Sequence, residues 1–509
     1  MRVKALCAWG GDMLRREAEG QQSSFGDLAR AARSIPRDHV LLRMKAAADW
    51  GEVEQALAGY YDLHEGRPSW PPAVLVRMLV LEHFGDLSDR EVSEQVAYNL
   101  LYRSFVGLGV DEAVPDDTTL VRFRARLGEQ GVREVFDLLN RQWEGAGLIG
   151  TERRVLDGSH LWGKVARRSW VSLMREGRTL VVEGLERVDP ARGKQLRERY
   201  VPPAEEREPR GEEALAVERE RTRQLLQEVK QVGDERVRER SRLLEAMLGE
   251  SDRPVSFVDP DARWGHKGED KPFCGYKTHE GIDPDSRMVT AVQVVAGNAN
   301  EAVRTDELLR QDSLGVQPGA VIIGDGLYNN ATTVGQVQEA GARGCFSGLK
   351  AERISDGFDY DAQADQMICA EKKHSIGKVR VDQGDLYYFS MSDCGSCPRK
   401  GQCLTRGERE GKAMPRRRVY LSEVRKAKIL AGQAGREWRR QHLKVRGRIE
   451  AKFDEQMNRH GLRRARYWGL AKVTVQVLLN VITVNLKRAA KLMSARAGPI
   501  PVAAVGVSA

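Results

Sequence analysis

Two short apolar runs, each followed by an aspartate, constrain the fold of this sequence most. Val155 and Leu156 lead into Asp157, and Ala320–Ile323 leads through a glycine into Asp325. Such runs are typical of buried β-strands, so both acids are expected at strand ends. Carboxylates at neighbouring strand ends can share hard cations, because Mg²⁺ takes one or two protein carboxylates and fills its shell with water and phosphate oxygens. The pattern favours a sheet with an acidic edge.

The composition indicates a soluble protein of several domains. Its 509 residues allow roughly two to four domains, and 82 Lys and Arg against 73 Asp and Glu leave a net charge of +9. The apolar stretch Val473–Val484 is interrupted by polar residues and is shorter than the roughly 20 apolar residues of a spanning helix. With no secretory signal expected and only seven cysteines, we expect a cytoplasmic protein without a membrane partner.

Residues 36–150 follow an N-terminal extension, residues 1–35, and are typical of an all-α domain. Pro71 and Pro72 suit the entry to a helix, and Ser88 with Glu91 has the spacing of a capping box. The connections between these helices are short. A compact helical domain is therefore expected before the first acid-tipped strand.

Residues 151–497 alternate strands and helices, which predicts a mixed α/β domain. The charged stretch 166–252 is expected to be a helical insert, with disorder as the alternative. A second insert, 351–440, carries cysteines, and residues 498–509 form a tail. The fold class expected is thus a mixed-sheet α/β domain with two inserts, preceded by an all-α domain.

A third acid, Glu450, lies on a predicted helix beside Ile449, Phe453 and Met457, which repeat every four residues. Because consecutive residues are about 100° apart around a helix, Glu450 is expected at the border of the buried face. Among 73 acids, however, a solvated or capping carboxylate is the ordinary case. Spacing alone does not decide between the two.

Four cysteines in the second insert could surround one Zn²⁺ ion. Cys394, Cys397 and Cys403 have the pattern C-x2-C-x5-C, and Cys369 lies upstream. Four thiolates can complete a tetrahedral zinc site, although these gaps are not standard finger spacings. Reduced free thiols and a disulfide are the alternatives.

Several segments, in a fixed order, resemble the DDE transposases of bacterial insertion sequences, in particular the branch numbered eleven eighty-two within the group numbered five. The matching pieces are PRDHVLLRM (36–44), GRPSWPPAVLVRMLVLEHFGDLSDREV (66–92), YRSFVGL (102–108), PDDTTLVRFRARL (115–127), VLDGSHL (155–161), DPDAR (259–263), GYKTH (275–279), IIGDGLYNN (322–330) and RGRIEAKFDEQMNRHGLRRARYWGLAKV (446–473). They span most of the chain, from about residue 25 to 490.

The resemblance implies an RNase H-like catalytic domain in which Asp157, Asp325 and Glu450 bind two Mg²⁺ or Mn²⁺ ions for phosphoryl transfer on DNA. Arg446 matches the arginine of the family's Y-R-E-K signature. The tyrosine and lysine positions of that signature hold Leu443 and Met457, which puts DNA positioning or activity in doubt.

DNA contacts are expected from both domains. In the helical domain the candidates for terminal-repeat recognition are Arg122, Arg124 and Arg126. In the catalytic domain they are Lys277, His279, Arg446, Arg448, Arg463 and Arg464. A basic band of this kind can neutralise phosphates without reading sequence. Solvated edge-strand residues and salt-bridged helix faces are the ordinary alternatives.

The function expected is a DNA transposase that binds the terminal inverted repeats of its element and catalyses metal-dependent strand cleavage and strand transfer into target DNA. A catalytically impaired relic that only binds DNA is the alternative, and a nuclease without strand joining is a third reading. The charged helical insert suggests a homodimer or higher oligomer in the DNA complex.

Overall fold

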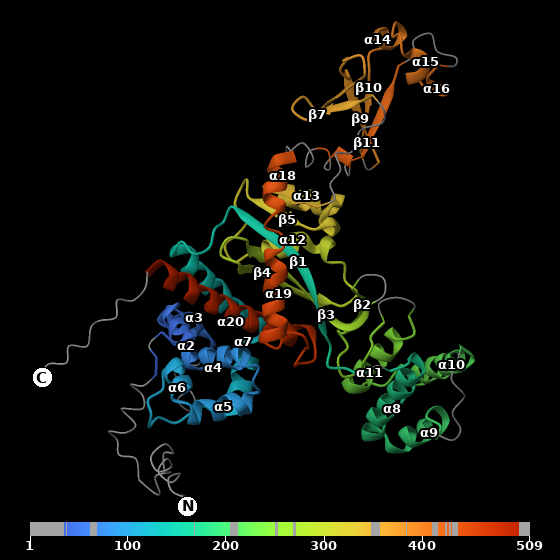
Figure 1. Ribbon diagram of the computed structural model, residues 1–509. Helices are drawn as coiled ribbons and strands as arrows, with labels where there is room; N and C mark the ends of the chain where they lie inside the picture. The colour runs from blue at the N-terminus through green and yellow to red at the C-terminus, as the bar shows by residue number, and fades with distance from the viewer. Residues whose placement is uncertain are drawn as a thin grey trace, which may run out of the picture.

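A computed structural model gives the fold (Figure 1). It describes residues 35–36, 38–61, 69–166, 168–203, 212–249, 253–267, 271–347, 357–382, 384–409, 416–422, 425–426, 429 and 436–497. The predicted N-terminal extension (except residue 35) and the tail lie outside the described residues, as do parts of both predicted inserts.

The chain begins with a helical layer. Its elements are α2 (Val40–Ala46), α3 (Trp50–Leu57), η1 (Ala58–Tyr60), α4 (Pro72–Phe84), α5 (Asp89–Tyr98), α6 (Leu100–Val106) and α7 (Asp117–Gly145). The sequence signals act as expected: Pro72 opens α4, and Ser88 and Glu91 form a capping box at α5. The apolar helix α4 is buried almost throughout, which explains its two aliphatic runs, Ala73–Val76 and Met78–Leu81.

A mixed sheet forms the centre of the molecule, as the mixed α/β prediction requires. Its strands are β1 (Arg153–Trp162), β2 (Arg263–His266), β3 (Pro272–Asp283), β4 (Met288–Ala296), β5 (Val321–Gly324) and β6 (Arg343–Phe346). β3 runs antiparallel to β1 and, along its other edge, antiparallel to β4 and β2. β1, β5 and β6 are parallel neighbours. The order across the sheet is therefore β4–β3–β1–β5–β6, with β2 continuing the β4 edge.

Helices cover both faces of this sheet. On one face, Val155 and Ile323 pack in the same core as the helices α7, α19 (Arg448–Arg459) and α20 (Leu470–Ala497). On the other face, Leu156 and Ile322 pack with α12 (Thr305–Arg310) and α13 (Ala331–Glu339). The short helices η3 (Glu301–Arg304) and η4 (Gly326–Tyr328) precede α12 and α13. The two faces are called the α19 face and the α13 face below.

The long helix α20 joins the helical layer to the sheet. It contacts α2, α4 and α7 as well as β4. By length and composition it is the one helix among the described residues that could cross a membrane, but most of it is buried inside the protein. Its polar residues are also bonded internally: Asn485 hydrogen-bonds β4 at Val289, and Asn480 donates to the carbonyl oxygen of His460. α20 is therefore a core helix.

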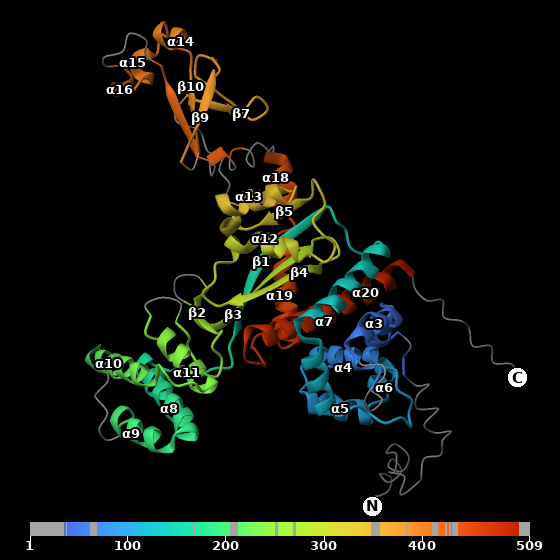
Figure 2. The same cartoon turned by 180° about the vertical axis from the view of Figure 1, so that it is seen from behind.

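Two modules extend from the central body (Figures 1 and 2). Between β1 and β2 lie α8 (Trp170–Val188), α9 (Pro190–Tyr200), α10 (Glu212–Val229) and α11 (Glu235–Ala246). Beyond β6 lie β7 (Asp359–Asp361), β8 (Gln366–Ile368), β9 (Gly377–Val381), β10 (Gly384–Tyr388), α14 (Met391–Gly395), α15 (Lys400–Cys403), α16 (Arg406–Arg409) and β11 (Arg418–Ser422). We call the elements from β7 to β11 the cysteine module. α18 (Arg436–Leu443) leads the chain back to α19.

Candidate active site

The first two predicted acids lie at matching positions on neighbouring strands. β1 and β5 are parallel, and their last paired residues are Val155 and Ile323. Two residues further along come Asp157 and Asp325. Asp325 directly follows β5, as predicted, but the predicted strand end at Asp157 is wrong, because β1 continues to Trp162 in its pairing with β3. Because side chains alternate between the faces of a sheet, both acids belong to the same face as Val155 and Ile323, the α19 face. Asp325 also caps η4 by accepting a hydrogen bond from Leu327 N at 2.8 Å.

The third predicted acid lies on the helix that covers this face. α19 packs against β1, with Ile449 and Phe453 buried toward the sheet as their spacing predicts. Met457 is half-buried, and Ser159 on β1 donates a hydrogen bond to its sulfur at 3.8 Å. Glu450, in the first turn of α19, is exposed and forms an ion pair with Arg446 at 3.2 Å. The structure thus brings all three acids to one face of the sheet, with Glu450 turned toward Arg446.

A fourth carboxyl group, which the sequence reasoning missed, adjoins Asp157. Glu280 on β3 pairs directly with Asp157 on β1 and is fully buried. Gln456 of α19 donates a hydrogen bond to it at 3.1 Å. Burial raises its pKa to about 7, and the charge of Asp157 adds to this shift. Glu280, Asp157 and Asp325 therefore form a row across three strands, and Glu280 ties that row to the helix that carries Glu450.

The donor set suits a hard cation only in part. Mg²⁺ and Mn²⁺ prefer carboxylate oxygens as ligands. Asp157 and Asp325 offer such oxygens from neighbouring strands on one face of the sheet. Among the described residues, however, no three His, Cys, Asp or Glu side chains already form a metal-binding group. To join a metal site, the Glu450 side chain would have to break its ion pair with Arg446. Because Glu450 is exposed, this movement would not disturb the hydrophobic core.

Lys277 and His279 project from β3 to the opposite face from Glu280. His279 is fully buried, and its Nε2 lies 2.5 Å from the hydroxyl group of Tyr328. Lys277 is half-buried and donates to the carbonyl oxygen of Ala299 at 3.0 Å. In this arrangement the imidazole offers no surface to a DNA phosphate. The predicted DNA contact is therefore wrong for His279, because the pairing of β3 with β1 turns this residue into the core under the α13 face.

The buried imidazole leads to a pH prediction. Burial lowers the pKa of His279 from its usual 6.5 to about 4, so between these values the unfolded chain binds a proton that the folded chain does not. Stability is therefore lost as the pH falls from 6.5 toward 4, by roughly 2 kcal/mol at pH 5. His279→Gln cannot charge, and it should lose about that much less than wild type between pH 7.5 and 5 in urea unfolding. Equal losses, or a drop in DNA affinity at neutral pH, would contradict this role.

The three arginines of α7 separate into two groups. Arg122 and Arg126 are exposed and line a cavity of about 490 Å³ together with Tyr61 and Trp70. Arg126 stacks on the ring of Tyr61 at 4.4 Å. Arg124 points the other way, because two residues along a helix is about 200°. It is buried and does not line the cavity that Arg122 and Arg126 share, although it borders a separate cavity of about 380 Å³ beside α20.

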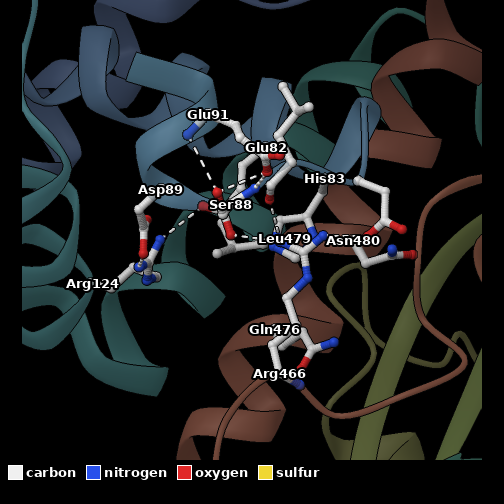
Figure 3. A network of polar contacts seen from close by, with 12 residues as sticks. Glu82, His83, Ser88, Asp89, Glu91, Arg124, Arg466, Gln476, Leu479 and Asn480 are labelled. Carbon is white, nitrogen blue, oxygen red and sulfur yellow. Dashed lines mark hydrogen bonds and ion pairs between the residues drawn. The ribbon is translucent and has the colours of Figure 1, made fainter. Parts of the chain in front are cut away.

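Arg124 belongs to a buried network that joins the helical layer to the loop after α19 (Figure 3). Its guanidinium contacts Glu82 at 2.8 Å and Asp89 at 2.5 Å. The other oxygen of Glu82 accepts from Arg466 at 2.8 Å, and the backbone N–H of Arg466 donates to Gln476 of α20 at 2.7 Å. Burial raises the pKa of Glu82 while both guanidinium groups oppose that shift. One carboxylate therefore holds two arginines from distant parts of the chain.

The remaining predicted DNA contacts surround α19. Arg463 and Arg464 are exposed, and their segment joins the end of β1, where Trp162 N donates to the carbonyl oxygen of Arg463 at 3.1 Å. Arg448 reaches the β3–β4 turn and pairs with Asp285 at 3.0 Å. With Arg446 paired to Glu450, Arg463 and Arg464 are the exposed members of this set, and Arg463 also donates a hydrogen bond to Asn458 Oδ1 at 2.5 Å.

The acids of the DPDAR segment hold the start of α20. Asp259 is buried; it accepts from the hydroxyl group of Tyr276 and from Gly469 N at 3.0 Å. Asp261 accepts from Leu470 N at 2.8 Å. These contacts explain both acids as a turn that anchors the helix.

Comparisons with known proteins agree at both ends of the chain. Residues 29–126 match the family described as a transposase domain, DUF772, and residues 368–490 match the family described as a transposase DDE domain. Glu450 lies inside the second match, whereas Asp157 and Asp325 lie between the two.

One curated relative and the solved structures complete these comparisons. An uncharacterized protein of Rhizobium meliloti, ORF8 in the nfe locus, is 33% identical over 140 residues, which are 27% of this chain. The aligned part is 65% of that relative, just under two thirds of its length. No solved structure matches the chain.

Proposed function

Because the chain belongs to the DDE transposases of insertion sequences, we propose that it binds the terminal inverted repeats of its element and catalyses metal-dependent strand cleavage and strand transfer. The proposal includes an RNase H-like catalytic domain with the helices α8–α11 and the cysteine module as its two inserts. Membership of the branch numbered eleven eighty-two is also part of it.

The observation that carries the proposal is the shared face of the three acids. Asp157 and Asp325 follow the last paired residues of two parallel strands, and α19 presents Glu450 above the same face. Strand order supports the RNase H-like assignment: β1 lies between the antiparallel hairpin β3–β4 on one side and the parallel strands β5 and β6 on the other.

Each residue has a role that its position supports. Asp157, Asp325 and Glu450 would hold two Mg²⁺ or Mn²⁺ ions, which in such sites activate the attacking oxygen and stabilise the departing one. Arg446, beside Glu450, is placed to offset negative charge that grows on the phosphate. Glu280 and Gln456 hold α19 in register with β1 and β3.

DNA would reach the site along exposed cations on both domains. Arg122 and Arg126 bound the cavity on α7 with two aromatic rings, a combination that suits backbone phosphates and bases. Arg463 and Arg464 lie beside the end of β1, where Arg464 forms a β-bridge with Trp162. We further propose that the active form on double-stranded DNA is a homodimer or higher oligomer in the bacterial cytoplasm, with its two inserts free to contact a second copy.

A labelled terminal-repeat duplex, incubated with the purified protein and Mg²⁺ or Mn²⁺, tests the proposal. We expect cleavage at the repeat end followed by joining to a target duplex. Binding without cleavage would favour the impaired relic, a reading that Met457 supports because it packs on Ser159 where the family has a lysine. Cutting without joining would indicate a nuclease. Chelation by EDTA is expected to stop both steps and leave binding intact.

A further inference from the structure

Four cysteines converge on one cavity in the cysteine module. Cys369 follows β8, Cys394 lies in α14, Cys397 follows that helix, and Cys403 ends α15. All four line a cavity of about 230 Å³. None of them forms a disulfide. Thiols separated by up to 34 positions in the sequence are thus gathered at one place by the fold.

The charged groups around this cavity are paired with one another. Asp393 lies 3.8 Å from Lys373, and Glu371 pairs with Arg399 at 2.9 Å. The oxygens of both acids therefore already have cationic partners. The sulfur atoms, which are soft ligands suited to zinc, are the groups best placed to bind an ion here.

A backbone amide already points at one of the sulfurs. Arg417 N donates a hydrogen bond to Cys394 Sγ at 3.4 Å, and the Arg417 side chain also lines the cavity. An N–H donor and a nearby guanidinium both stabilise negative charge on sulfur. Burial nevertheless raises the pKa of the Cys394 thiol, and the Arg417 N–H opposes only part of that shift. A metal ion would therefore have to displace the thiol proton on binding.

The module has a small hydrophobic core. Its buried cluster consists of Phe358, Tyr360, Met367, Tyr387, Phe389, Val419 and Leu421, and three of the four cysteines pack against it. The three-stranded sheet β11–β10–β9 uses only one face for this core. On the other face Val379 is 54% and Tyr420 46% exposed. Domains with so little core usually need a disulfide or a structural metal to fold stably.

We propose that Cys369, Cys394, Cys397 and Cys403 bind one structural zinc ion, which fastens α14 and α15 to the β-strands of the module. In this structure no three of these side chains, or of any other His, Asp or Glu among the described residues, already form a metal-binding group. Zinc binding would therefore draw the four sulfurs inward to its tetrahedral shell. The short helices α14 and α15, which end beside the cavity, are the parts that would move.

The ion would also act on the basic strand of the module. Arg416–Arg418 leads into β11, and the backbone of Arg417 is tied to Cys394. Fixing Cys394 therefore fixes this run of three arginines. The zinc ion would in this way fix the position of the basic strand, although the ion itself would not touch whatever the arginines bind.

The metal content of the full-length protein tests the proposal directly. Protein expressed with added zinc and passed through a desalting column should contain one zinc per chain by plasma mass spectrometry. X-ray absorption should show four sulfur ligands at about 2.3 Å. A zinc content well below one, a shell containing nitrogen or oxygen, or an intact mass that reveals a disulfide among these cysteines would each overturn it.

Variants separate this site from adventitious zinc. The double substitution Cys394→Ser and Cys397→Ser should lower the zinc content at least about tenfold, because two thiolate ligands are lost. Cys274→Ala, at a buried cysteine of β3, is the matched control and should keep one zinc. If the double variant retains zinc, the ion is adventitious and the proposal is wrong. X-ray absorption on the wild-type protein decides the matter even if the double variant fails to fold.

Discussion

Asp157→Ala, Asp325→Ala and Glu450→Ala are each expected to reduce strand cleavage by at least about 10²- to 10³-fold, the cost of losing one charge-stabilising group in a preorganised site. The reason is that each acid has its own place: Asp157 lies within β1 just past its pairing with β5, Asp325 follows β5, and Glu450 lies on α19. The adjoining Glu280 is buried and hydrogen-bonded to Gln456, so we do not expect it to replace any of them. The measurement is single-turnover cleavage of a terminal-repeat duplex at saturating protein.

Asp454→Asn is the matched control for the third acid. Asp454 is exposed on α19 one turn after Glu450, so the substitution removes the same charge from the same side of the same helix. It should leave cleavage within about twofold and DNA binding unchanged. If Asp454→Asn abolished cleavage while Glu450→Ala did not, the third acid would have to be reassigned by one turn. If all three alanine variants cleaved normally, the site itself would be wrong.

Arg124→Met is expected to lower the free energy of unfolding by about 3 to 5 kcal/mol, the usual cost of removing one partner of a buried ion pair. Glu82, which is 1% exposed, would keep Arg466 but lose its second cation, and Asp89 would also lose its partner. Because methionine fills a similar volume, the loss of stability would come mainly from the missing charge and not from a new cavity. Urea unfolding monitored by circular dichroism measures it.

Arg122→Met provides the control on the same helix. Its side chain is exposed, so stability should change by less than about 0.5 kcal/mol. DNA affinity should fall, because Arg122 bounds the open cavity on α7. The opposite pattern, with Arg124→Met stable and weak in DNA binding, would show that Arg124 is a surface contact and that the buried network is not as described.

The sequence predicts the central sheet well because its signals are local. The apolar runs before Asp157 and Asp325 predict β1 and β5, which the structure confirms. Residues of other local signals lie where such signals act: Pro284, Asp285 and Ser286 turn the chain between β3 and β4, and glycines follow α19. Gly461 and Gly469 both have positive φ, at 68° and 89°. These features need no distant partner, so reading the chain residue by residue is enough to find them.

Features that depend on distant partners were harder to predict. The strands of the cysteine module are three to five residues long, too short for a periodic signal, and side chains from separate turns hold them together. The sequence analysis did not distinguish α8 from α9 within the charged stretch. The signal was present, because Asp189 is the N-cap and Pro190 the first residue of α9.

Part of the site could have been read more closely from the sequence. A spacing of two separates Arg124 from both Arg122 and Arg126, which already places it on the far side of the helix. Glu82, the one acid in the mostly apolar helix α4, is the partner that such a buried arginine needs. For Glu280 no comparable signal exists, because only the register of β1 against β3 sets it beside Asp157.

The position of α20 constrains the order in which the protein can fold during translation. α2, α4 and α7 all pack on α20, and Thr483 and Ser494 contact Val80 and Arg43. A ribosome adding about 5 to 20 residues per second needs on the order of 20 to 90 s to proceed from Val40 to Leu470. During that interval the N-terminal helices lack part of their core. The nascent chain therefore cannot complete the core of its helical layer until α20 has been translated.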